Sequence, residues 1–174
     1  FYTDNSVSNG FTYYYVVTAS NYDGNESGYS NEASATPHAP GVVNVAISDY
    51  ITNYGTVVGT YQATQSQNNE YQAITEKHSG GKPSKRTDLM EHIWTFDVTG
   101  GNNIFNVDAY YEDAGDGDNG FQFSWSTSLN DTWITMGLSV TKTSDNNTYQ
   151  TADLGAVSGT IYVRVIDNNR VQGQ

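Results

Sequence analysis

The chain has 174 residues, no cysteine, and a formal charge of −12 from 19 acidic and 7 basic side chains. Without thiols, disulfides, thiol catalysis and cysteine-bound zinc are excluded, and the negative charge disfavours nucleic acid and anionic membranes as partners. Tyrosine and glycine are abundant, a composition that favours strands and tight turns over helices. Because no apolar run approaches the roughly 20 residues that span a bilayer, membrane insertion is not expected. We therefore expect an all-β protein that is secreted, extracellular or attached to the cell surface.

Residues 11–20 alternate between two faces and are predicted to form a strand, with Tyr13 and Tyr15 on the same face. Residues 21–25 (Asn-Tyr-Asp-Gly-Asn) are a turn signal, and residues 30–35 are expected to return as a second strand.

With Val7-Ser-Asn-Gly-Phe-Thr-Tyr13 before it and Pro37 after it, this pattern resembles the last third of a fibronectin type III domain. In that immunoglobulin-like family a tyrosine packs at the corner of the sandwich, a place that Tyr13 holds here. The resemblance covers residues 1–37 and implies that residues 1–36 are the C-terminal strands of such a domain. Two or three strands cannot bury both of their faces, so neighbouring domains or other chains are predicted to complete the sheet.

Residues 37–41 (Pro-His-Ala-Pro-Gly) stop both strands and helices and are predicted to form a stiff linker. Beyond it, residues 42–174 show strand patterns separated by turn clusters, with no convincing helical period. This succession predicts a two-sheet β-sandwich, and the jelly roll is the favoured form. The expected strands span residues 43–48, 56–61, 71–76, 89–98, 104–111, 121–126, 132–143 (counted as two strands), 149–154 and 159–166.

Strand alternation also predicts which side chains of this second region form the core. Four stripes repeat every second residue, as expected for strands with one buried face. Together they make a core of sufficient size for independent folding. The predicted stripes are Met90, His92, Trp94, Phe96 and Val98; Phe105, Val107, Ala109 and Tyr111; Phe121, Phe123 and Trp125; and Ile161, Val163 and Val165.

The second region carries several distinctive motifs: Tyr71-Gln-Ala-Ile-Thr-Glu76, Gly80-Gly-Lys-Pro-Ser-Lys-Arg86, Phe121-Gln-Phe-Ser-Trp-Ser126, and Ser158 to Val165. Between Gly55 and Arg170 the chain resembles the jelly-roll carbohydrate-binding modules appended to exported bacterial and archaeal hydrolases. The resemblance implies a non-catalytic accessory module that binds polysaccharide or a cell-surface glycan. Such modules occur in secreted glycoside hydrolases and also in proteases, so either is an expected parent. Further strands are expected after Arg170, which predicts a module truncated at its C-terminus.

Exposed aromatic side chains are the expected ligand-binding groups. A sugar ring has apolar faces that stack on an aromatic ring, while its hydroxyl groups bond nearby polar side chains. Trp133 is the strongest candidate, because Ile134 and Met136 occupy the other face of its strand. The alternative is that these aromatic residues cover the sandwich or contact a neighbouring domain. The predicted platform residues are Trp133, Tyr110, Tyr162 and Tyr54, and Tyr50 is also expected to face outward.

A loop rich in acidic residues is the candidate metal site. Asp113, Asp116 and Asp118 are crowded among glycines that let backbone carbonyls turn inward, and oxygen-rich sites of this kind hold Ca²⁺. The spacing differs from that of an EF-hand. The sequence thus predicts a structural Ca²⁺ here, with a solvated acidic hairpin as the alternative.

No catalytic centre is expected. The carboxylates on predicted strands, Glu76, Glu91, Asp97 and Asp108, are not placed in pairs across a groove as glycosidases require. The three histidines lack metal-ligand spacing, and no Gly-x-Ser-x-Gly motif is present. We therefore predict a binding module and not an enzyme. A structural or adhesive β-sandwich in an extracellular assembly or fibre is the alternative, because unpaired sheet edges invite strands from other chains.

Overall fold

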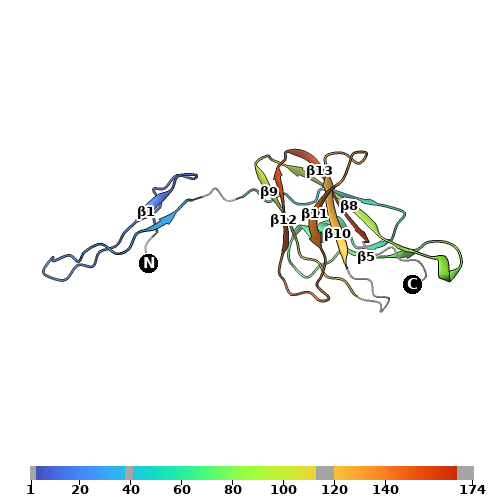
Figure 1. Ribbon diagram of the computed structural model, residues 1–174, viewed down its shortest axis with the longest axis horizontal. Coiled ribbons are helices and arrows are strands. Elements are labelled where there is room, and N and C mark those ends of the chain that lie inside the picture. The colour runs from blue at the N-terminus through green and yellow to red at the C-terminus, as the bar shows by residue number, and fades with distance from the viewer. Residues whose placement is uncertain (1–2, 38–40, 113–119, 168–174) are drawn as a thin grey trace. The chain divides into compact units, whose positions relative to one another are not determined.

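Figure 1 shows a computed structural model, which describes residues 3–37, 41–112 and 120–167 and separates the chain into two compact units, Phe1–Val42 and Val43–Gln174. The described residues form antiparallel strands, apart from two short 3₁₀ helices, η1 (Tyr61–Gln65) and η2 (Pro83–Lys85). The prediction of an all-β sandwich is confirmed. In the described part of the chain, no helix is both long enough and apolar enough to cross a bilayer.

The first unit contains one β-hairpin, in which β1 (Tyr13–Tyr15) pairs with β2 (Ala33–Ala35). Both strands are shorter than the sequence predicted, because serine hydroxyls replace part of the backbone ladder. The backbone N–H of Val17 donates to Ser30 Oγ at 3.0 Å, and a second serine hydroxyl accepts the N–H of Ala19.

The turn predicted at residues 21–25 is present in the hairpin. Its first residue supplies the acceptor that shapes it. Asn21 Oδ1 accepts the N–H groups of Asp23 at 3.0 Å and Asn25 at 2.9 Å. An asparagine side chain that bonds the backbone two residues ahead is a common way to stabilise a tight turn.

A five-stranded antiparallel sheet dominates the second unit, and we call it the main sheet. Its strand order is β11-β10-β13-β8-β3, so that β13 lies between β8 and β10. Figure 1 shows these strands side by side. Their bounds are β3 (Ser48–Ile51), β8 (Glu91–Val98), β10 (Phe121–Ser126), β11 (Ile134–Ser139) and β13 (Gly159–Asp167).

Three two-stranded sheets complete the second unit. The longest pairs β9 (Asn102–Val107) with β12 (Gln150–Ala156), and its side chains pack against the main sheet. The others pair β4 (Thr56–Val58) with β5 (Ala73–Thr75), and β6 (Lys77–His78) with β7 (Asp88–Leu89).

The four predicted inward stripes do form the core. Period-two alternation sends every second residue of β8, β10 and β13 to the same side, where apolar burial stabilises the fold. His92 is fully buried in the same stripe. The buried members are Met90, Val98, Phe123, Val140, Ile161, Val163 and Val165, and the partly buried side chains against them include Trp94, Phe96, Phe105, Val107, Ala109, Tyr111, Phe121 and Trp125.

Some predicted strand bounds were wrong. A strand was expected at 43–48, but β3 begins at Ser48. Just before it, the carbonyl of Ala46 accepts a hydrogen bond from Gln65 Nε2 at 2.7 Å instead of from a strand neighbour. Residues 132–143 form one strand, β11, whose pairing with β10 is irregular near the positive φ of Gly137.

Candidate functional site

The main sheet has a second face, which is turned away from the core and carries polar and aromatic side chains. Strand register places Tyr50, Ile93, Arg164, Ser124 and Thr135 in one row across all five strands. The next row contains Ser48, Thr95, Tyr162 and Ser126. We call this surface the outer sheet face. The residues used below are Tyr50, Glu91, Ile93, Thr95, Ser124, Ser126, Trp133, Tyr162 and Arg164.

Arg164 organises one half of the outer sheet face. Its guanidinium carbon lies 4.2 Å from the centre of the Trp133 ring, a cation–π contact in which the cation faces the negative side of the ring. The same guanidinium approaches Glu91 Oε1 at 3.4 Å and donates from Nε to Ser124 Oγ at 3.3 Å. The Arg164 side chain on β13 thus contacts residues of β8 and β10 and the tryptophan that directly precedes β11, and these contacts hold the indole in a defined orientation.

Two tyrosines form the other half of the face. Tyr50 and Tyr162 have ring centres 6.3 Å apart and planes tilted by 59°, and Tyr50 keeps 45% of its surface exposed. The tilt means that the two rings do not form one flat surface. The two ring planes face different directions, so a ring-shaped ligand could contact both rings at an angle.

Four side chains of the outer sheet face that lie beside the tyrosines and Arg164 are buried. Ile93, Thr95, Ser124 and Ser126 are all less than a tenth exposed. Their cross-strand neighbours on this face include the larger side chains of Tyr50, Tyr162 and Arg164. The outer sheet face is therefore a packed, preformed surface, and binding on it would require little ordering of side chains.

The four platform residues predicted from the sequence lie in three places. Trp133, which directly precedes β11, and Tyr162 of β13 lie on the outer sheet face. Tyr110 follows β9, where its ring meets Tyr71 edge-on with centres 5.6 Å apart. Tyr54 follows β3 and lines a separate recess beside β6. The structure brings together only the first two of these residues.

Tyr71, the partner of Tyr110, has a structural role of its own. Its hydroxyl donates to Asp145 Oδ2 at 2.6 Å. This bond raises the pKa of Tyr71 to about 12 and lowers the pKa of the Asp145 carboxyl. Since the two residues are 74 positions apart, the bond fastens the segment before β5 to the loop before β12. We assign this cluster to loop anchoring.

The predicted Ca²⁺ ligands Asp113, Asp116 and Asp118 lie outside the described residues. Within the described residues, no three His, Asp or Glu side chains are gathered in a way that could hold a metal ion. The Ca²⁺ site stays a prediction.

The strand carboxylates have local partners. Glu91 is paired with Arg164, Asp97 accepts a bond from Thr160 at 2.8 Å, and Asp108 forms an ion pair with Lys142 at 2.5 Å. Glu91, Asp97 and Asp108 therefore each have a structural contact with a neighbouring side chain.

A buried polar network lies on the core side of β8. His92 has no exposed surface, and its Nε2 lies 3.2 Å from Asp49 Oδ2. Gln72 connects the network, because its amide donates to Asp49 at 2.5 Å and its carbonyl accepts from Trp94 Nε1 at 2.7 Å. The network fixes the edge strand β3, which carries Tyr50 on its opposite side.

We expect stability to fall as the pH is lowered below 6.5, because burial lowers the pKa of His92 from that usual value and outweighs the opposing attraction of Asp49. The neutral imidazole is favoured in the fold, so its contribution is complete above pH 6.5 and is lost as the pH falls. Asp49 is the charged group facing the ring; Trp94 and Gln72 carry no charge. Urea unfolding at pH 7.5 and 5.5, compared with H92Q, measures the effect. An equal pH dependence in both proteins would contradict the assignment.

Arg164 was not recognised from the sequence as a functional residue. One signal was available, because Arg164 lies two positions after Tyr162 in a predicted strand and must share its face. Its contacts could not be inferred in the same way, since Glu91 lies 73 positions away and meets it only through the pairing of β8 with β13.

Comparison with known proteins gives one partial match. Over 39 residues, or 22% of this chain, the sequence is 56% identical to an amylopullulanase of Thermoanaerobacter thermohydrosulfuricus, a glycoside hydrolase. The match covers 3% of that enzyme's length. No protein-family model matches the chain, and no solved structure does. Part of the chain is therefore similar to a short segment of an amylopullulanase.

Proposed function

We propose that this chain is a non-catalytic accessory region of a secreted, multidomain glycoside hydrolase and that its second unit binds polysaccharide through the outer sheet face. The observation that carries the proposal is the Trp133 ring held by Arg164, beside the two tyrosines of the same face. Fixed aromatic rings stack on sugar faces, and the surrounding hydroxyl, guanidinium and carboxylate groups bond sugar hydroxyls.

The geometry of the face favours a soluble glycan chain over a crystalline surface. Rings tilted by 59° cannot lie together on a flat lattice, but they can flank a chain that twists. The similarity to an amylopullulanase makes α-glucans the first ligands to examine.

The first unit is proposed to be the C-terminal part of a fibronectin type III domain that acts as a spacer. Tyr13 supports this assignment, because its hydroxyl accepts the backbone N–H of Ser8 at 2.9 Å. A tyrosine that bonds backbone a few residues upstream is the corner contact of this family. Phe11, Tyr14 and Val17 remain more than half exposed, which is consistent with a sheet that further strands complete.

Affinity electrophoresis of the chain in gels containing pullulan, amylopectin or hydroxyethyl cellulose tests the main proposal. We expect retardation by at least one α-glucan and none by a gel without glycan. Normal migration in every gel, by protein with an intact fold, would reject glycan binding. Concentration-dependent sedimentation in that case would favour the alternative, a structural component of an extracellular assembly.

A further inference from the structure

The few positive charges of this acidic protein are concentrated in one short segment. Four of the seven lysine and arginine residues lie between positions 77 and 86, where β6 leads into β7. Residues 77–89 contain a single carboxylate, Asp88. We call residues 77–89 the basic hairpin; its cations are Lys77, Lys82, Lys85 and Arg86.

Backbone and side-chain bonds hold the basic hairpin in a defined shape. Three hydrogen bonds join Ser79 and Thr87. Ser79 N–H donates to the Thr87 carbonyl at 2.8 Å, Thr87 N–H donates to Ser79 Oγ at 2.8 Å, and Thr87 Oγ1 donates to Ser79 Oγ at 3.3 Å. The tip is closed by a bond from Lys85 N–H to the Lys82 carbonyl at 2.8 Å, and Arg86 Nε donates to the Gly81 carbonyl at 3.0 Å. The positive side chains therefore extend from an ordered loop.

The lysines of the hairpin are available to a ligand. Asp88 is engaged by His78, so it is not committed to a lysine. In the part of the chain that the structure describes, Lys77, Lys82 and Lys85 form no ion pair with a carboxylate. Among the residues that the structure describes, these three ammonium groups have no counter-charge, and an external anion could supply one.

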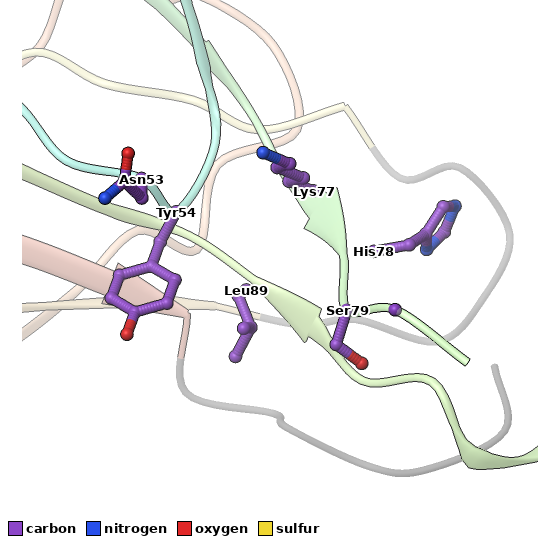
Figure 2. A pocket seen from close by; sticks show the side chains of 7 residues that line it. Asn53, Tyr54, Lys77, His78, Ser79 and Leu89 are labelled. Carbon is purple, nitrogen blue, oxygen red and sulfur yellow. The ribbon is translucent and has the colours of Figure 1, made fainter.

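A recess at the base of the hairpin adds a feature that points to a sugar. It has a volume of about 190 Å³, below the range of roughly 300–1,000 Å³ of drug-sized pockets and suited to one sugar ring. Tyr54 and Leu89 supply apolar surface, and Asn53 and Ser79 supply polar groups. In Figure 2, Asn53 and Tyr54 lie on one side of β6 and the His78 ring on the other. The lining residues are Asn53, Tyr54, Lys77, His78, Ser79, Gly80 and Leu89.

We propose that the basic hairpin and this recess form a second binding site, for an anionic polysaccharide such as a uronic-acid polymer. One sugar would lie in the recess beside Tyr54, with its carboxylate at Lys77, and the following carboxylates would meet Lys82 and Lys85. This site shares no residue with the outer sheet face, so it does not depend on neutral-glycan binding there.

The net negative charge of the protein disfavours densely charged polymers such as nucleic acid more than it disfavours a uronic-acid chain. At physiological salt, fields are screened over about 8 Å, so the hairpin attracts an anion locally despite the net charge of −12. Nucleic acid carries one charge per about 1.7 Å of duplex, and most of it would lie against the acidic remainder of the protein. A uronic-acid chain has at most one charge per sugar and places a neutral ring between charges, which the recess can accept.

Titration with polygalacturonate at low and high salt, with the double variant K82Q/K85Q, tests this inference. We expect binding that weakens as salt increases and that falls about tenfold or more in the variant. The matched control is T143E/T151E, which changes the net charge by the same two units at exposed positions outside the hairpin. The control should keep most of the affinity, and Y54A should lose part of it.

Other outcomes would overturn the inference. Equal losses in K82Q/K85Q and T143E/T151E, with both folded by near-ultraviolet circular dichroism, would show a response to net charge alone. Single-stranded DNA bound as tightly as polygalacturonate would remove the assignment to a glycan. W133A should leave polygalacturonate binding unchanged and K82Q/K85Q should leave pullulan binding unchanged, so failure at either site is distinguishable from failure at the other.

Discussion

Replacing Trp133 by alanine is expected to weaken α-glucan binding by about five- to a hundredfold without unfolding the protein. Stacking on an aromatic side chain contributes about 1–3 kcal/mol per ring in the comparable case of nucleic acid bases. Trp133 is also the ring that Arg164 covers at 4.2 Å, so its removal frees the guanidinium and loosens that half of the outer sheet face. Isothermal titration with the glycan that retards the chain measures the loss.

The control for this variant is Y149A, which removes another exposed aromatic ring just before β12, at a position that is not part of the outer sheet face. We expect Y149A to bind as the wild type does. W133F should keep part of the affinity, because a smaller ring still stacks. If W133A and Y149A bind equally well, the outer sheet face is not the glycan site, whatever the chain binds elsewhere.

The contacts of Arg164 indicate that this residue orders the outer sheet face in addition to any contact that it makes with a ligand. An arginine stacked on tryptophan and paired with Glu91 at 3.4 Å is partly shielded from solvent, so it orders the face before any ligand arrives. Lysine in its place would keep the charge but lose the planar group that covers the indole. The preformed state of the surface therefore depends on guanidinium geometry and not on charge alone.

The sequence predicts which face a residue occupies much better than which residues meet. Period-two alternation placed Phe123, Val163 and Trp94 in the core, and the structure confirms this. The same rule placed Trp133 and Tyr162 outward. It could not show that they share one sheet, because the order β11-β10-β13-β8-β3 is set by pairings between distant strands.

Tyr54 and Tyr110 illustrate the limit of that rule. Both follow the end of a strand, β3 and β9 respectively, where the backbone leaves the sheet and alternation no longer predicts the direction of a side chain. Tertiary contacts decide instead: Tyr110 packs edge-on against Tyr71, and Tyr54 lines the recess beside β6. The strand expected at 43–48 does not form, for a related reason. The side-chain amide of Gln65 donates a hydrogen bond to the Ala46 carbonyl.

Replacing Phe123 by alanine is expected to lower the free energy of unfolding of the second unit by about 3–5 kcal/mol, the usual cost of removing a buried phenylalanine. Phe123 is 2% exposed. The centre of its ring lies 5.4 Å from the ring centre of Phe105 on β9 and 6.4 Å from that of Trp94 on β8. It therefore joins the main sheet to the β9–β12 pair, and its loss opens a cavity between them.

Urea denaturation followed by tryptophan fluorescence measures the effect of F123A, because Trp94 adjoins the new cavity. A loss of this size would be a large fraction of the 5–15 kcal/mol typical of a domain. The control is I104A on β9, whose side chain is 61% exposed and should cost less than about 1 kcal/mol. If F123A were no more destabilised than I104A, the two sheets could not be packed through this ring, and the sandwich that supports the outer sheet face would need a different core.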